Sequence, residues 1–176
     1  QVLDVLHEQA ITYVNIGDQR TCGGSVRGTW HRGGWRMDLG AAATMVRDTL
    51  GAAIGGAPWL ATPELNGSLA RTYNTWTIAV FARYQGDQRG YTVLDDASIG
   101  RSSVAAFAMV DASLGRQFLS GLLNVRIGCK NLLDVTNLDA TIGGTGAHSG
   151  SGTSVPMSTG RTYFLRVEFT LKKNGA

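Results

Sequence analysis

The sequence predicts an all-β protein of about eight antiparallel strands. Several segments alternate apolar and polar side chains with a period of two, which is the spacing of a strand with two different faces. The 176 residues include 24 glycines, only 3 prolines and 16% charged residues, a composition that fits many short strands and turns. No run of about 18 apolar residues occurs, so a transmembrane helix is not expected.

The clearest strand signal lies in residues 161–171, where every odd-numbered side chain from Tyr163 to Leu171 is apolar. The residues between them are mostly polar, and a helix would mix the two sets around its surface. The same alternation predicts strands at residues 35–41, 76–84 and 123–130. Less regular patterns predict four more strands, at residues 8–15, 20–30, 65–73 and 103–114.

The predicted connectors are of two kinds. Short and long connectors nearly alternate along the chain, as in a membrane barrel with short periplasmic turns and long outer loops. The connector at residues 15–19 is the exception. It is short, although the alternation of connectors along the chain places it among the long outer loops. The tight connectors are residues 31–34, 73–75 and 115–121, and the long ones are residues 47–62, 85–102 and 134–160.

Alternation alone leaves the environment of the strands open. Charged residues such as Arg126 and Arg166 would lie on the face opposite the apolar row. A membrane barrel with a polar lumen explains this arrangement, and so does a soluble sandwich or lipocalin-like barrel with a wet outer face. A more specific signal has to decide between them.

Composition and motifs exclude several functions. The 16 lysines and arginines are scattered and the net charge is only +3, which argues against nucleic-acid binding. Cys22 and Cys129 form no metal-binding or disulfide pattern; we expect Cys129 to act as a small hydrophobe, and the role of Cys22 is open. We expect no metal and no cofactor. No nucleophile elbow, zinc-protease or phosphate-loop motif occurs, so an enzyme is not expected, and an outer-membrane protease or phospholipase is the competing class.

Two ordered motifs carry a resemblance to a known family. Residues 128–134 read GCKNLLD and resemble the GVKNLFD element near the C-terminus of TonB-dependent receptors. After a long loop, GRTYFL at residues 160–165 is similar to the family's entry into its closing strand. Residues 13–24 resemble a family hairpin in which a basic residue usually stands at the position of Cys22. Similar strand entries and exits occur at residues 62–67 and 83–86.

This resemblance implies that residues 1–176 are the C-terminal part of a transmembrane β-barrel, without the plug and the N-terminal strands. The chain begins abruptly at Gln1, which fits a piece of a longer protein. The implied function is TonB-dependent uptake of an iron–siderophore, haem or cobalamin-like ligand across the bacterial outer membrane. Its partners would be outer-membrane lipid, the small-molecule ligand and a periplasmic TonB-type protein. The alternative is a standalone eight-stranded outer-membrane barrel with a structural or adhesive role.

Candidate site residues fall into two groups. His148, in the glycine-rich tract 143–152, is a candidate ligand contact because long loops without internal structure are often functional. Trp59 and Tyr91, in the other long connectors, could stack on a ligand, although anchoring at the membrane interface is favoured. The charged residues predicted to face the lumen are Arg36, Asp38, Arg83, Asp111, Arg126, Arg166 and Glu168.

Overall fold

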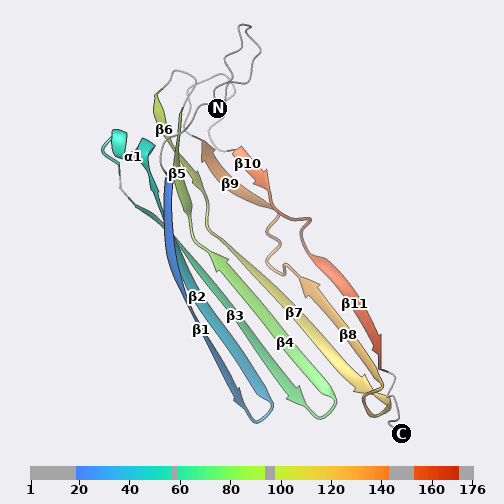
Figure 1. Ribbon diagram of the computed structural model, residues 1–176. Helices are drawn as coiled ribbons and strands as arrows, with labels where there is room; N and C mark the ends of the chain where they lie inside the picture. Colours follow the sequence, from blue (N-terminus) through green and yellow to red (C-terminus); the bar gives the residue numbers. More distant parts are fainter. Residues whose placement is uncertain (1–18, 57–58, 94–97, 143–152, 171–176) are drawn as a thin grey trace.

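The computed structural model describes residues 19–56, 59–93, 98–142 and 153–170, and these form antiparallel sheets (Figure 1). The larger sheet has seven strands in the order β1-β2-β3-β4-β7-β8-β11, and the smaller has four in the order β10-β9-β6-β5. The predicted fold class, an antiparallel β-barrel segment, is confirmed. The barrel is not closed, because β1 and β11 lie at opposite edges of the larger sheet. The strands of the larger sheet are β1 (Gln19–Arg32), β2 (Trp35–Asp48), β3 (Leu60–Tyr73), β4 (Trp76–Gln85), β7 (Phe107–Phe118), β8 (Leu123–Lys130) and β11 (Thr162–Phe169).

Seven of the predicted strands correspond to the seven strands of the larger sheet. The remaining predicted strand, residues 8–15, lies outside the described residues. Several strands are longer than expected: β2 continues to Asp48 and β3 already begins at Leu60. The added segments are rich in alanine and threonine, so their two faces differ too little in polarity for alternation to reveal them.

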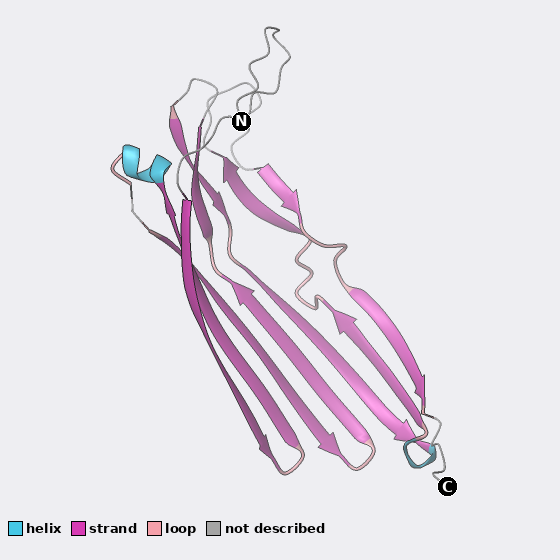
Figure 2. Ribbon diagram, viewed as in Figure 1, coloured by secondary structure: helices cyan, strands magenta, loops and turns pink. Residues whose placement is uncertain are grey.

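Short turns gather at one end of the larger sheet, which we call the turn end (Figure 2). The β1–β2, β3–β4 and β7–β8 connections lie there, as the sequence predicts. The turns are built on residues with positive φ, including Gly33 at 53°, Asn74 at 52° and Ser120 at 56°, a region that glycine and asparagine adopt most readily. At the opposite end, the loop end, β2 leads through the short helix α1 (Thr49–Ala53) into β3.

The long connectors differ from the prediction, because they contain strands of their own. Residues 85–102 hold β5 (Gln88–Val93) and the start of β6 (Ile99–Val104), and residues 134–160 hold β9 (Asn137–Ile142) and β10 (Thr153–Pro156). The predicted strand 103–114 is split between β6 and β7. At this break the carboxylate of Asp87 accepts the backbone N–H of Ala106 at 2.9 Å, which replaces a bond of the strand ladder.

The larger sheet has no conventional hydrophobic core. Among the described residues, only Cys129 and Ala140 are buried apolar side chains. Large apolar residues instead stand in the open, with Val26 70% and Leu165 66% exposed. A soluble sandwich would cover such a face with a second sheet, so a lipid environment accounts for it better. No helix in the described ranges is long and apolar enough to span a membrane.

Candidate functional site

Charged side chains share one face of the larger sheet, which we call the polar face. The pairing between strands is continuous, so residues directly opposite each other project to the same side. One row runs across four strands through Asp38, Ser68, Phe81 and Asp111. All seven residues predicted to face the lumen lie on this face. That the face borders a lumen stays a prediction, because the sheet is open.

Asp38 is the centre of a hydrogen-bond network that joins three strands. Its carboxylate accepts hydrogen bonds from the Thr29 hydroxyl of β1 at 2.7 Å and from the Ser68 hydroxyl of β3 at 3.2 Å. The Nε of Arg36, two residues away on β2, donates to the same carboxylate at 2.9 Å. A carboxylate with three donors and a cationic neighbour is a structural junction, and it is a poor general base.

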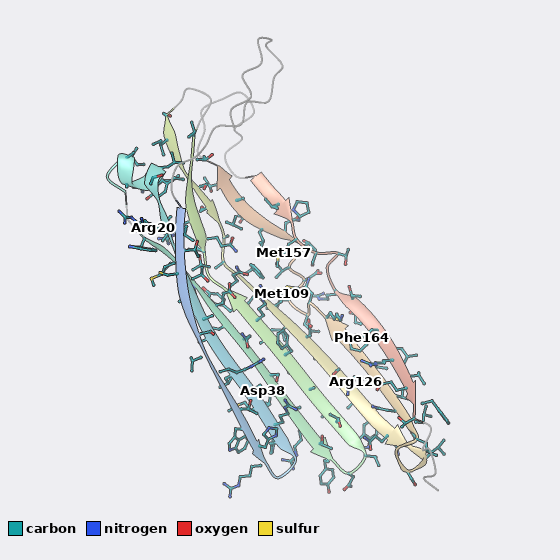
Figure 3. All side chains as sticks on the ribbon, in the orientation of Figure 1. Arg20, Asp38, Met109, Arg126, Met157 and Phe164 are labelled. Carbon is teal, nitrogen blue, oxygen red and sulfur yellow. The ribbon has the colours of Figure 1, made fainter. Side chains whose placement is uncertain are left out.

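A second charged group lies on β8 and β11. The Arg166 guanidinium and the Glu168 carboxylate are 2.6 Å apart, and the Asn124 amide donates to the same carboxylate at 3.4 Å. Arg126 lies directly opposite Arg166, and its Nε is 3.5 Å from the position of a Cβ added to Gly115. Figure 3 labels Asp38 on β2 and Arg126 on β8.

A hollow opens on the polar face between these two groups. It is bordered by charged side chains from several strands, including Arg36, Asp38, Asp111 and Lys130, and by the Phe164 ring. Figure 3 labels Asp38 and Phe164. The ring lies over Gly128, where an added Cβ would be 2.5 Å from its nearest carbon. Such an aromatic ring over a glycine of the neighbouring strand stabilises a sheet. Ser68, whose hydroxyl donates to the Asp38 carboxylate, also lines this hollow.

The opposite face, which we call the outer face, is apolar and ends in aromatic side chains. Two arginines at the turn end lie over aromatic rings: the Arg71 guanidinium is 4.7 Å from the Trp35 ring, and that of Arg116 is 4.8 Å from the Trp76 ring. Such a border is typical of a membrane–water interface. The aromatic residues of this border are Trp30, Trp35, Tyr73, Trp76, Phe118 and Phe169.

Asn131 anchors the crossing from β8 to the smaller sheet. It is only 2% exposed, and its amide nitrogen donates to the Val135 carbonyl at 3.0 Å and to the Ser158 hydroxyl at 2.9 Å. Its side-chain oxygen accepts the Val135 N–H at 3.0 Å. The backbone of Asn131 has a φ of 53°, a conformation that asparagine tolerates better than most residues.

The two sequence motifs that resemble the family meet at this point. The Asp134 carboxylate accepts the backbone N–H of Arg161 at 3.1 Å, and the Arg161 side chain donates to the Leu132 carbonyl at 2.9 Å. The Gly160 N–H donates to the Ser158 hydroxyl at 3.2 Å. We call Asn131, Asp134, Ser158, Gly160 and Arg161 the latch. It connects the end of β8 to the start of β11, so these motifs have a structural role here.

Replacing Gly160 with alanine tests the tightness of the latch. Gly160 has a φ of 83°, and an added Cβ would lie 2.9 Å from the Asp134 carboxylate. Gly121 is a matched control, because its φ is 88° but its added Cβ would meet nothing within 4 Å. We expect Gly121→Ala to cost about 1 kcal/mol and Gly160→Ala about 2 kcal/mol or more in urea unfolding. Equal costs would contradict the contact.

Comparison with protein families identifies the chain. The family model described as "TonB dependent receptor-like, beta-barrel" matches residues 3–132, which is more than half of the chain. The chain belongs to the TonB-dependent receptor family. Comparison with curated proteins and with solved structures gives no match. The barrels of this family lie in the bacterial outer membrane and serve TonB-dependent transport.

Of the three candidate ligand contacts of this receptor, Tyr91 lines a pocket that Leu60, the residue after Trp59, also lines. Tyr91 on β5 packs against α1, because a Cβ added to Gly51 or Gly56 would overlap its ring. Trp59 stands just before β3 and is 41% exposed. His148 lies outside the described residues. Ligand contact by His148, Trp59 or Tyr91 therefore stays a prediction.

Both cysteines of the receptor are free thiols. Cys129 is buried and donates to the Lys130 carbonyl at 3.4 Å, whereas Cys22 is exposed and lies opposite Met45 on the outer face. No group of three metal-binding side chains occurs in the described part of the chain.

The sequence analysis did not single out Arg71 and Arg116, which lie on the outer face. A signal was available, because Arg71 has the odd numbering of the apolar residues of β3 and Arg116 has the even numbering of those of β7.

Proposed function

We propose that the intact receptor imports a scarce, bulky nutrient such as an iron–siderophore, haem or a cobalamin-like ligand. Family membership supports TonB-dependent transport in general. The outer face would contact outer-membrane lipid, and the ligand would first meet the hairpins at the loop end. A periplasmic TonB-type protein would supply energy through a plug domain outside this chain. The protein would act as a transporter and not as an enzyme.

The observation that carries this proposal is the family match over residues 3–132, and the larger sheet has the form of a barrel segment. β1 pairs only with β2, and β11 pairs only with β8, among the described strands. Eight-stranded barrels close around a lumen filled by side chains, whereas 22-stranded transporter barrels enclose a plug. Ion pairs such as Arg36–Asp38 and Arg166–Glu168 on an open polar face fit a wide, hydrated lumen. The family match, and not these pairs, favours a transporter over a standalone small barrel.

Growth rescue tests the proposal with the intact gene product. A host without receptors of its own would be grown on a panel of iron chelates, haem and cobalamin, each as the limiting nutrient. We expect rescue by one ligand class, lost when the TonB-type partner is deleted or the proton gradient is collapsed. A folded protein that rescues growth on no ligand, or without the partner, would contradict the proposal. A folded protein that rescues growth on no ligand is the result expected of the structural or adhesive alternative.

A further inference from the structure

Two arginines lie side by side at the loop end of the outer face. Arg20 on β1 is directly opposite Arg47 on β2, and both side chains are exposed. The row below them is apolar, with Cys22 opposite Met45. Figure 3 labels Arg20 at the end of β1 near α1, far from the turn end. Two like charges directly opposite each other in adjacent strands repel, so an anion between these two side chains would be favourable.

No ion pair to Arg20 or Arg47 is found among the side chains that the structure describes, which do not include those of Gln19 and Asp48 beside them. The ion pairs found among the described side chains involve Arg36, Arg89 and Arg166. The outer-face arginines at the turn end have a different environment, because Arg71 and Arg116 are held over aromatic rings. Neither Arg20 nor Arg47 lies over a ring among the described residues.

Trp59 directly precedes β3 and has the odd numbering of the outer-face residues of that strand. The last residue pair between β2 and β3 is Val46 with Leu60, and Arg47 and Trp59 are the next residues beyond it. Trp59 is 41% exposed. Tryptophan and arginine together at the upper border of an apolar face are suited to the headgroup region of a membrane.

We propose that Arg20 and Arg47 bind the phosphate of an anionic glycolipid in the outer leaflet, with Trp59 beside it at the headgroup level. Guanidinium groups bind phosphate oxygens bidentately, and a phosphate between the two side chains would remove their repulsion. The acyl chains would lie on the apolar residues below. This proposal rests on the orientation in the proposed function, with the loop end outside the cell.

The test uses the intact receptor in phosphatidylcholine nanodiscs that contain diphosphoryl lipid A or its dephosphorylated form. Native mass spectrometry counts the glycolipid that remains bound after transfer to detergent. We expect the wild type to retain the phosphorylated lipid, and the double variant Arg20→Gln/Arg47→Gln to bind it about 10-fold more weakly. Added salt should weaken binding to the wild type. Heat-resistant gel mobility checks that each variant is folded.

Matched variants make the result specific. Arg71→Gln/Arg116→Gln removes the same charge from the same face at the turn end, and we expect it to bind like the wild type. Arg20→Lys/Arg47→Lys keeps the charge without the bidentate geometry, and we expect intermediate binding. Equal retention by wild type and the Arg20/Arg47 glutamine variant, or of both lipid forms by the wild type, would overturn the proposal. If only Arg71→Gln/Arg116→Gln lost binding, the orientation with the loop end outside the cell would be wrong. A failure of the proposed transport function would appear in the growth-rescue experiment and not in this one.

Discussion

Replacing Ile127 with arginine is expected to destabilise the folded barrel by about 2–4 kcal/mol, because it places a charge in the lipid-facing band. Ile127 is 53% exposed on the outer face. It lies between Leu114 of β7 and Leu165 of β11, so an arginine there has no acidic neighbour in its row. Urea unfolding of the intact protein in phosphatidylcholine vesicles measures the cost.

Two controls separate the face from the charge. Asn124→Arg introduces the same side chain on the polar face of the same strand, close to the Glu168 carboxylate, and should change stability by no more than about 0.5 kcal/mol. The double variant Arg126→Ile/Ile127→Arg keeps the composition but exchanges the faces, and should be at least as damaging as Ile127→Arg. Equal stabilities of the Ile127 and Asn124 variants would contradict a lipid-facing outer face.

The strands of the larger sheet could be predicted where the two faces differ strongly in polarity. The predicted strand 123–130 coincides with β8 (Leu123–Lys130), and the predicted strand 76–84 differs from β4 (Trp76–Gln85) by one residue. In these segments, burial of one face against lipid and hydration of the other leave a period of two in the sequence. The second half of β2 lacks this contrast, so its end at Asp48 could not be predicted.

The smaller sheet could not be predicted, because its strands depend on pairing between distant segments. β5 and β6 carry no regular alternation, and β6 is held by β9 through pairs such as Ser103 with Thr141. Nothing within either short segment favours a strand on its own. Turn-forming residues at the breaks, such as Gly86 and Asn131, were the local signals that marked the boundaries.

The face of each charged residue followed from its strand, but the charge pairs did not. Odd and even positions place Arg126 and Arg166 on the polar face. That they stand directly opposite each other depends on the register between β8 and β11, which a single strand does not contain. The latch shows the same limit: resemblance located both motifs, but the contact between Asn131 and Ser158 appears only when the two segments are folded together.

Replacing Asn131 with alanine is expected to destabilise the protein by about 2–4 kcal/mol. The substitution removes three hydrogen bonds of a side chain that is 2% exposed, and it leaves the Val135 N–H and carbonyl without these partners. Alanine also adopts a φ near 53° less readily than asparagine. Equilibrium urea unfolding in lipid vesicles measures the total loss.

Asn137→Ala is the matched control for this prediction. Asn137 is an exposed asparagine in the same connector, and its side chain makes a 3.3 Å hydrogen bond to the neighbouring Thr136 hydroxyl. We expect its replacement to cost no more than about 0.5 kcal/mol. Equal losses in the two variants would mean that Asn131 acts only through general effects of removing an amide.

A double-mutant cycle with Ser158→Ala decides whether the latch acts as one unit. The Ser158 hydroxyl accepts from Asn131 and donates to the same Val135 carbonyl at 2.8 Å, so the two side chains share one network. Because each single variant already breaks that network, the double variant should cost less than the sum of the single losses by about 0.5–3 kcal/mol. Hydrogen exchange should accelerate mainly at the start of β11, where Arg161 is bound to Asp134. Strictly additive losses, with unchanged exchange in β11, would show that the β8 and β11 motifs are stabilised independently.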